Sequence, residues 1–127
     1  MIHGIGTDIV AIARIEAGLA RFGDKFARRI LAPQELQGFI ASVSPASFLA
    51  KRFAAKEAAV KALGTGFRGG ISLAQIAVSN DLHGKPVLSF SGRALDVCNS
   101  LGIGETHLSL SDEKDYAIAF VTLMRRS

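Results

Sequence analysis

RFAAKEAAVKALGTG, residues 52–66, reads as the end of a long helix that is apolar or alanine on nearly every side yet carries charges. On a helical wheel of about 100° per residue, Leu49, Phe53 and Val60 lie in one apolar sector, and Lys56 falls inside it. A helix that is apolar all round is usually buried. This segment is therefore predicted to be the central helix of the fold.

The ends of this helix are marked by residues that favour helix termini. Pro45 suits a first turn, and Ser44 before it is expected to cap the helix. Leu63 is followed by Gly64, a favoured residue just beyond a helix C-terminus. The helix is predicted to run from about residue 45 to residue 63.

The charged residues of this helix need partners if the helix is buried. Glu57 and Lys61 lie four residues apart, and on an exposed face they would form an ordinary ion pair worth about 0.3–0.5 kcal/mol. Lys56 has no evident partner, which favours a second interpretation. In that interpretation an anion and a cation meet in a site at the rim of the core.

The remaining segments predict an α+β domain, with a mostly antiparallel sheet packed against the long central helix. Hairpin signals near the C-terminus favour antiparallel pairing, and no linker or repeat divides residues 1–127. Strands are expected at residues 1–8, 75–79, 86–90, 106–111 and 116–124, and further helices at 11–22, 25–31, 33–40 and 91–101.

The composition is that of a globular protein, with 49% hydrophobic and 20% charged residues among 127. The single cysteine, Cys98, excludes an internal disulfide. No segment resembles a signal peptide or approaches the roughly 20 apolar residues of a membrane span, so the cytoplasm is expected and no membrane partner is. The net charge of +4 favours an anionic partner: nucleic acid, a phosphorylated cofactor or an acidic protein.

The glycines at positions 64, 66 and 69 spell G-x-G-x-x-G, a pattern of dinucleotide-binding loops. In that motif a strand precedes the loop and a helix follows it, whereas here the predicted order is helix, loop and strand. The segment is interpreted as a connector. Its backbone N–H groups, together with Arg68, still have the chemistry to contact phosphate oxygens.

Asp8 ends the first apolar segment, where a strand is expected to meet a loop. Either Thr7 or Asp8 could cap the following helix. Alternatively, Asp8 and Glu57 are two oxygen ligands for a hard cation such as Mg²⁺, which takes one or two carboxylates. Spacing alone does not join positions 8 and 57.

These motifs together resemble one enzyme family. GIGTDIV (4–10) with RIE (14–16), and the Lys-Glu-Ala-x-x-Lys motif at 56–61, are similar to the signature motifs of the 4′-phosphopantetheinyl transferase family. The resemblance covers essentially the whole chain. Further matching segments are GISLAQIAV (70–78), HGKPVLSFSG (83–92) and HLSLSDEKDYAIAFV (107–121).

The resemblance implies a reaction, a fold and an assembly. The family moves 4′-phosphopantetheine from coenzyme A (CoA) to a serine of apo acyl carrier protein, with Mg²⁺ as cofactor, and releases adenosine 3′,5′-bisphosphate. This activation serves fatty acid biosynthesis. The implied fold is a small α+β unit, and short bacterial members assemble as trimers with active sites between subunits.

The resemblance also implies roles for individual residues. It assigns Mg²⁺ to Asp8 and Glu57, and it assigns a phosphate of the transferred group to Lys61. Lys56 is expected in the same cluster as a further contact to CoA. The serine of the carrier needs a base, and Glu57 is the first choice, directly or through a water held by the metal. Cations are needed here because negative charge on the pyrophosphate must be stabilised as a P–O bond breaks.

The nucleotide of CoA is expected to lie against other residues. His107 alternates with Ser109 and Ser111 on a predicted strand, and this polar face is either simply exposed or contacts the 3′-phosphate. The resemblance favours the contact, and Arg52 is a further candidate for that phosphate. The residues expected to form walls of the nucleotide site are Gly64, Thr65, Lys85 and Pro86.

Four basic residues, Arg14, Arg21, Lys25 and Arg28, would form one stripe on a continuous helix, although Gly23 could break it. The stripe is either a solvated face or a docking surface for the acidic carrier protein, with Arg14 and Arg21 as the favoured pair. Two rival functions are a nucleic-acid-binding module and a structural trimer. The first lacks support, because the chain has no Trp, one Tyr and no aromatic residues interleaved with basic ones.

Overall fold

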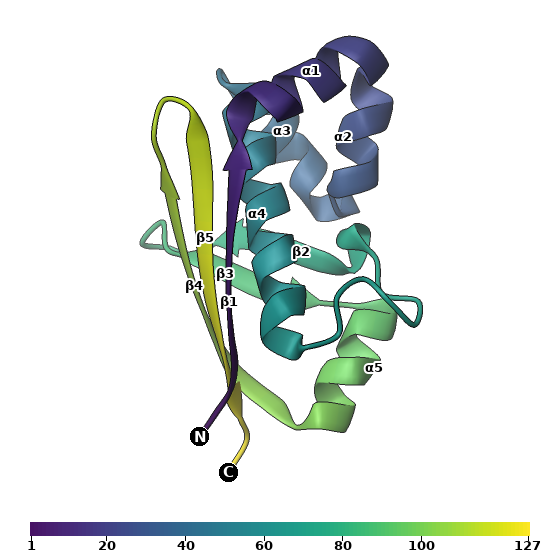
Figure 1. Cartoon of the computed structure of the whole chain (residues 1–127), viewed down its shortest axis with the longest axis vertical. Coiled ribbons are helices and arrows are strands. Elements are labelled where there is room, and N and C mark those ends of the chain that lie inside the picture. The colour runs from purple at the N-terminus through teal and green to yellow at the C-terminus, as the bar shows by residue number, and fades with distance from the viewer.

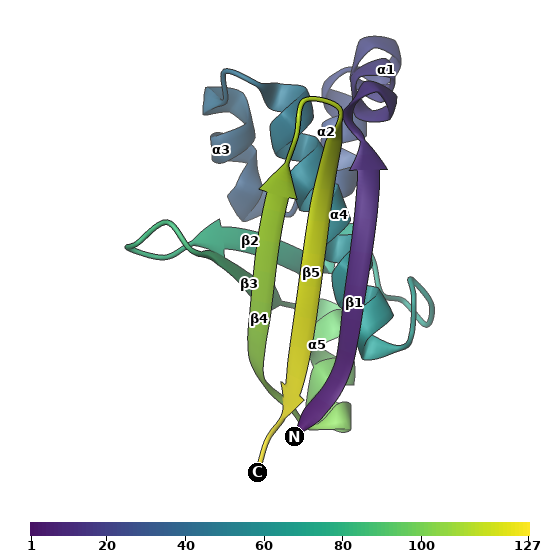
Figure 2. The same cartoon turned by 60° about the vertical axis from the view of Figure 1, so that its left-hand side comes forward.

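The central helix predicted from the sequence is α4 (Pro45–Leu63), and it lies along one face of a three-stranded antiparallel sheet (Figure 1). The computed structural model describes residues 1–127. The sheet has the strand order β1 (Ile2–Ala11), β5 (Tyr116–Arg125) and β4 (Ile103–Asp112). Figure 2 turns the other face of this sheet towards the viewer, and no helix covers that face. The predicted α+β class with antiparallel pairing is confirmed.

Two glycines allow β1 to lie directly on the backbone of α4. A Cβ atom on Gly4 would lie 2.0 Å from the carbonyl oxygen of Ala62, and one on Gly6 would lie 1.9 Å from that of Ala58. Any other residue at these positions would push strand and helix apart. Because side chains alternate along a strand, Asp8 lies on the same, helix-facing side of β1 as these glycines.

A second, two-stranded sheet crosses behind α4 in the view of Figure 1 and packs against both α4 and β4. Its strands are β2 (Ile76–Asn80) and β3 (Pro86–Phe90), and α5 (Gly92–Leu101) connects them to the larger sheet. The turn between β2 and β3 projects from the body of the molecule, and Leu82 at its tip is fully exposed.

The chain segment that joins β1 to α4 forms short helices at one end of the molecule (Figure 1). They are α1 (Ile12–Phe22), α2 (Asp24–Ile30), the 3-10 turn η1 (Pro33–Glu35) and α3 (Leu36–Ala41), and a further 3-10 turn, η2 (Leu73–Gln75), precedes β2. The chain turns sharply between α1 and α2 at Gly23, whose φ of 61° favours glycine.

The core is formed where α4 meets both sheets. Leu49 and Val60 of α4 are buried there with Ile76 of β2 and with Val121 and Leu123 of β5. The alanine-rich sides of α4 are buried as predicted, because the helix packs against β1, β5, β2 and α1. None of the helices combines the length and apolar character that a membrane crossing requires.

The predicted helix ends are confirmed only in part. Gly64 ends α4 in the left-handed conformation, with φ of 85°, but the side chain of Ser44 makes no capping hydrogen bond at the other end. The prediction that Thr7 or Asp8 caps a helix is wrong, since β1 continues to Ala11 before α1 begins. Asp8 therefore lies within a strand, not at its end.

Candidate functional site

The structure brings Asp8 of β1 beside Lys61 of α4. The Lys61 Nζ donates to Asp8 Oδ1 at 3.0 Å and to the Thr7 carbonyl oxygen at 3.0 Å. An exposed Glu57–Lys61 pair was one interpretation of the sequence, but the hydrogen-bonding partner of Lys61 is Asp8. The ammonium group of Lys61 has three N–H donors, and its half-exposed side chain leaves one free for an anion.

Glu57 completes this cluster, one helical turn before Lys61. Burial raises the pKa of the Glu57 carboxyl above its ordinary value, and the negative charge of Asp8 raises it further. Lys61 and Arg14 act in the opposite direction. The site therefore holds two carboxylates close together with cations around them. No group of three or more His, Cys, Asp or Glu side chains is placed to bind a metal, so a cation here would need ligands from water or substrate in addition.

The expectation that Lys56 lacks a partner and joins the phosphate cluster is wrong. Its side chain is fully buried, and its Nζ donates to Glu35 Oε1 at 2.6 Å, to the Ile30 carbonyl oxygen at 2.6 Å and to the Leu73 carbonyl oxygen at 3.1 Å. All three N–H donors are thus used. Burial lowers the pKa of Lys56, and the Glu35 carboxylate opposes that shift. Lys56 is an internal ion-pair partner with no donor left for CoA.

Arg52 lies one turn before Lys56, and its side chain is mostly buried. Its guanidinium stacks over the Phe48 ring at 4.5 Å, and its Nε lies 3.6 Å from Glu35 Oε2 without forming a hydrogen bond. The side chain lines a cavity of about 300 Å³ that Lys51 and Pro86 also line. Arg52 and Pro86 are therefore brought together, as a shared nucleotide site requires.

His107 and Lys85 line a separate cavity of about 240 Å³ on the uncovered side of the sheet. Leu108, Ser109, Phe120 and Thr122 complete it, and the His107 Nε2 lies 3.2 Å from Glu105 Oε1. This cavity adjoins the Arg52 cavity along the chain, because Gly84 and Pro86 on either side of Lys85 line the latter. The two cavities offer cations and hydroxyls to an anionic ligand, and Asp112 is the one carboxylate that lines them.

The loop after α4 lies beyond Lys61. Gly64 and Gly66 both have positive φ, and Thr65 donates its hydroxyl hydrogen to the Gly66 carbonyl oxygen. The order is helix, loop and 3-10 turn, so the predicted departure from a dinucleotide-binding fold is confirmed. Gly64 and Thr65 follow the helix that carries Glu57 and Lys61, but they line neither of the two cavities above.

The predicted single basic stripe is broken, because Gly23 ends α1 and α2 turns back on it. Arg14 and Lys25 now line an apolar groove of about 420 Å³ between α1, α2 and α4, together with Arg29. Arg28 lies on the opposite face of α2, against α3. Arg21 is outside the groove, with its guanidinium 5.1 Å from the Phe22 ring centre.

Three phenylalanines give the groove its apolar surface, and sequence patterns did not single them out for this role. Phe22, Phe26 and Phe53 come from three different helices, and the Arg14 guanidinium lies 5.9 Å from the Phe53 ring centre. Phe22 is half-exposed. The positive charge of Arg14 also acts to lower the pKa of Glu57, so this side of the groove is electrostatically coupled to the carboxylate cluster.

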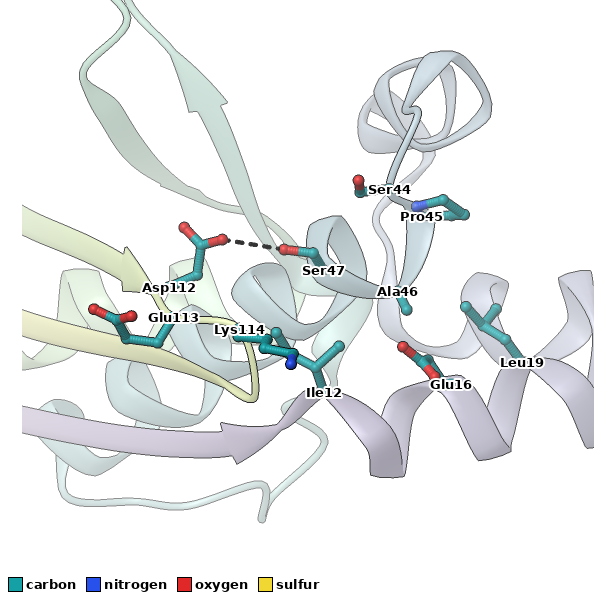
Figure 3. Close-up of a pocket in the computed structure, with 10 residues that line it drawn as sticks. All are labelled: Ile12, Glu16, Leu19, Ser44, Pro45, Ala46, Ser47, Asp112, Glu113 and Lys114. Atoms are coloured by element: carbon teal, nitrogen blue, oxygen red, sulfur yellow. Dashed lines mark hydrogen bonds between the residues drawn. The ribbon is translucent and has the colours of Figure 1, made fainter.

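A wider groove of about 730 Å³ lies elsewhere, between the start of α1, the start of α4 and the β4–β5 turn (Figure 3). Glu16, Asp112 and Glu113 line it, with Lys114 as its one cation. Ser47 donates to Asp112 Oδ2 at 3.3 Å across one side. The excess of carboxylates makes this groove unsuited to a phosphate ligand.

Comparison with known proteins agrees with this geometry. The chain matches the 4′-phosphopantetheinyl transferase superfamily over residues 4–121. A holo-[acyl-carrier-protein] synthase of Halorhodospira halophila is 56% identical over 124 residues, which cover 98% of each chain. The crystal structure of the holo-[acyl-carrier-protein] synthase from Neisseria meningitidis has a TM-score of 0.92 at 48% identity, covering 98% of this chain and 100% of that one. The Bacillus anthracis synthase in complex with CoA (3′,5′-ADP) has a TM-score of 0.82 at 40% identity, covering 99% of each. The chain therefore belongs to the 4′-phosphopantetheinyl transferase superfamily and, within it, to the holo-[acyl-carrier-protein] synthases.

Proposed function

We propose that the chain transfers the 4′-phosphopantetheine group of CoA to a serine of apo acyl carrier protein, in a Mg²⁺-dependent reaction that serves fatty acid biosynthesis in the cytoplasm. The observation that carries the proposal is the cluster of Asp8, Glu57 and Lys61 in a chain of this family. Relatives that are named for this activity and solved with CoA support the choice of substrate.

The donor set fits Mg²⁺. Asp8 and Glu57 supply carboxylate oxygens, which are the ligands that this hard cation prefers, and they come from two rigid elements packed closely through Gly6. Their mutual repulsion is relieved when a cation lies between them. When bound, Mg²⁺ would supply electrostatic stabilisation of the pyrophosphate oxygens of CoA.

The chain's own residues perform the remaining steps. The serine oxygen of the carrier bonds to the phosphorus nearer the pantetheine, and the bond from that phosphorus to the bridging oxygen breaks. Adenosine 3′,5′-bisphosphate leaves with the electron pair. Glu57 takes the serine proton, directly or through a water. The free N–H of Lys61 stabilises charge on the phosphoryl oxygens.

The groove between α1 and α2 suits the carrier. Acyl carrier proteins are acidic, and the groove combines Arg14, Lys25 and Arg29 with an apolar floor. A helix with one acidic and one apolar side would satisfy both features. Because Arg14 also lies near Glu57, a carrier bound here presents its serine next to the carboxylate cluster.

A trimer is supported by the uncovered face of the sheet (Figure 2). Its exposed apolar residues are Ile5, Ile9, Tyr116, Ile118 and Phe120. His107 lies on this face, whereas Asp8 faces α4 on the other side. One CoA molecule would reach both residues most directly if they came from neighbouring subunits. We therefore infer a homotrimer whose sites lie between subunits.

The proposal is tested by incubating the protein with CoA, Mg²⁺ and apo acyl carrier protein and measuring the mass of the carrier. The expected result is a gain equal to one 4′-phosphopantetheine group on the carrier, with release of adenosine 3′,5′-bisphosphate. A carrier whose serine is replaced by alanine is the matched control and should gain nothing. An unchanged mass of the wild-type carrier would overturn the proposal.

A further inference from the structure

Glu35 is a buried carboxylate that the reaction described above does not use. Its side chain is fully buried, and each of its oxygens accepts a backbone hydrogen bond: Oε1 from the Ala32 N–H at 2.7 Å and Oε2 from the Val78 N–H at 2.9 Å. Oε1 also accepts from Lys56 at 2.6 Å. The carboxylate is thus fixed in position by three elements.

The second oxygen of Glu35 faces Arg52. The Arg52 Nε lies 3.6 Å from Oε2, which is beyond hydrogen-bonding distance, and it is buried without any hydrogen-bond partner. The guanidinium is confined by the Phe48 ring at 4.5 Å. The Arg52 side chain lines a cavity with Lys51, Pro86 and Asp112, and the Asp112 carboxylate is paired with Lys51 at 3.8 Å. The buried Nε–H thus interacts with Glu35 by charge alone, and only the outer nitrogens of the guanidinium remain to bind a ligand.

We propose that Glu35 is a positioning residue that holds the Arg52 guanidinium ready for the 3′-phosphate of CoA. The inference rests on the proposed function and assigns a role to a residue outside the metal and phosphate cluster. Glu35 has no exposed atom for a ligand to reach, so it acts through Arg52 alone.

The chemistry of the two groups favours this role over simple stabilisation of the fold. Lys56 already balances the charge of Glu35, so a second cation is not required for neutrality. Arg52, the second cation, instead has its Nε near the fixed Glu35 carboxylate, and its side chain lines the cavity that Lys51 also lines. A guanidinium held in this way needs little reorganisation when it binds a phosphate, and it can offer two parallel N–H donors.

The experiment compares CoA with 3′-dephospho-CoA as substrates for wild type, Arg52→Gln and Glu35→Gln. The ratio of their kcat/KM values reports the 3′-phosphate contact alone, because every other part of the substrate is shared. We expect wild type to prefer CoA and Arg52→Gln to lose most of that preference. Glu35→Gln is expected to lose about tenfold of it through the KM for CoA, with the rate for 3′-dephospho-CoA little changed.

Arg126→Gln is the control for loss of one positive charge, since Arg126 is exposed and binds only the Asn99 carbonyl oxygen by its side chain. It should keep the wild-type ratio. A Glu35→Gln protein that folds but keeps the wild-type ratio would overturn the proposal. If Glu35→Gln does not fold, Glu35→Gln with Lys56→Met removes both buried charges and is measured in its place.

A measurement on the wild-type protein tests the premise that Arg52 responds to the 3′-phosphate, while the Glu35 variants test the positioning role. The Arg52 Nε–H signal in a ¹⁵N spectrum should shift on adding adenosine 3′,5′-bisphosphate and should not shift on adding adenosine 5′-monophosphate. The same shift with both nucleotides, or with neither, would overturn the proposal. Failure of the carrier to gain mass in the wild-type assay would instead contradict the transferase function, so the two failures are distinguishable.

Discussion

Gly6 sets the distance between the two carboxylates of the site. Its missing side chain lets β1 lie on α4, and Asp8 follows two residues later on the same side of the strand. The glycines of the GIGTD motif therefore bear on the chemistry of the site, because they set the distance between β1 and α4. If β1 and α4 were separated, Asp8 and Glu57 could no longer share one cation.

Replacing Gly6 with alanine is expected to lower the free energy of unfolding by about 2–3 kcal/mol, because the new Cβ would lie 1.9 Å from the backbone oxygen of Ala58. Denaturant titration measures this change. The matched control is Gly104→Ala in β4, where a Cβ would lie 2.8 Å from Cγ of the Arg126 side chain but no closer than 3.5 Å to a backbone atom. Equal stability losses for the two variants would contradict the close-packing account.

Cys98 is expected to be unreactive in the folded protein. Burial raises the pKa of its thiol to about 11, and its side chain is inaccessible. A thiol reagent such as DTNB should therefore label Cys98 at pH 8 only after unfolding. The thiol of the unfolded chain ionises at about pH 8.5, below the pKa of the folded protein. The stability that the neutral, buried thiol adds to the folded state is therefore fully present below about pH 8.5 and is lost as pH rises towards 11. Rapid labelling of native protein at pH 8 would show that the α5 region opens.

Lys56 shows where prediction from the sequence stops at this scale. The helical wheel placed it in the apolar sector, and the structure buries it there. Its partner Glu35 lies 21 positions away in a short 3-10 turn, so no helical or strand periodicity relates the two. The Asp8–Lys61 contact spans 53 positions, and only the family resemblance brought position 8 together with the helix.

At the scale of elements, α4 carries both groups of candidate site residues on different sides. Glu57 and Lys61 face β1, while Arg52 faces the β2–β3 hairpin. The limits of α4 were predictable because Pro45 and Gly64 mark them chemically. The path of α2 was not predictable, since the direction of the chain after Gly23 depends on packing against α4 and η2.

The turn at Gly23 predicts different roles for two adjacent arginines. Arg29 lines the groove, whereas Arg28 lies on the opposite face of α2. Charge reversal at Arg29 to glutamate is expected to raise the KM for acyl carrier protein about tenfold or more and to leave the KM for CoA unchanged. The effect should shrink at high salt, because exposed charges are screened.

Arg28→Glu is the matched control for this prediction, since it makes the same change of charge one residue away. Steady-state kinetics with each substrate varied in turn gives the two KM values. Equal increases for Arg28→Glu and Arg29→Glu would show that carrier recognition follows net charge and not the groove.

At the scale of the whole molecule, the sheet separates two residues that the proposed reaction uses together. Asp8 and His107 lie on opposite faces of the same three strands. The sequence predicted that His107 alternates with other residues along a strand. It did not predict which face of the sheet is uncovered, because the glycines of β1 decide which face α4 packs against (Figure 2).

Mixing Asp8→Ala subunits with His107→Ala subunits is expected to restore part of the lost activity. In a mixed trimer some interfaces pair an intact Asp8 with an intact His107 from the neighbour. The transfer rate of the mixture, compared with each variant alone, measures the effect, and light scattering gives the assembly state. An active monomer, or a trimer in which mixing restores nothing, would contradict sites shared between subunits.

The central claim is that Asp8 and Glu57 together hold Mg²⁺ at the site of transfer. The measurement that tests it most directly is the initial rate of carrier modification as a function of Mg²⁺ concentration, for wild type and for folded Asp8→Ala. The wild-type rate should rise to saturation with Mg²⁺ and vanish in a chelator, whereas Asp8→Ala should remain inactive at the Mg²⁺ concentrations that saturate wild type. An Asp8→Ala protein that transfers at the wild-type rate at limiting Mg²⁺ would contradict the claim.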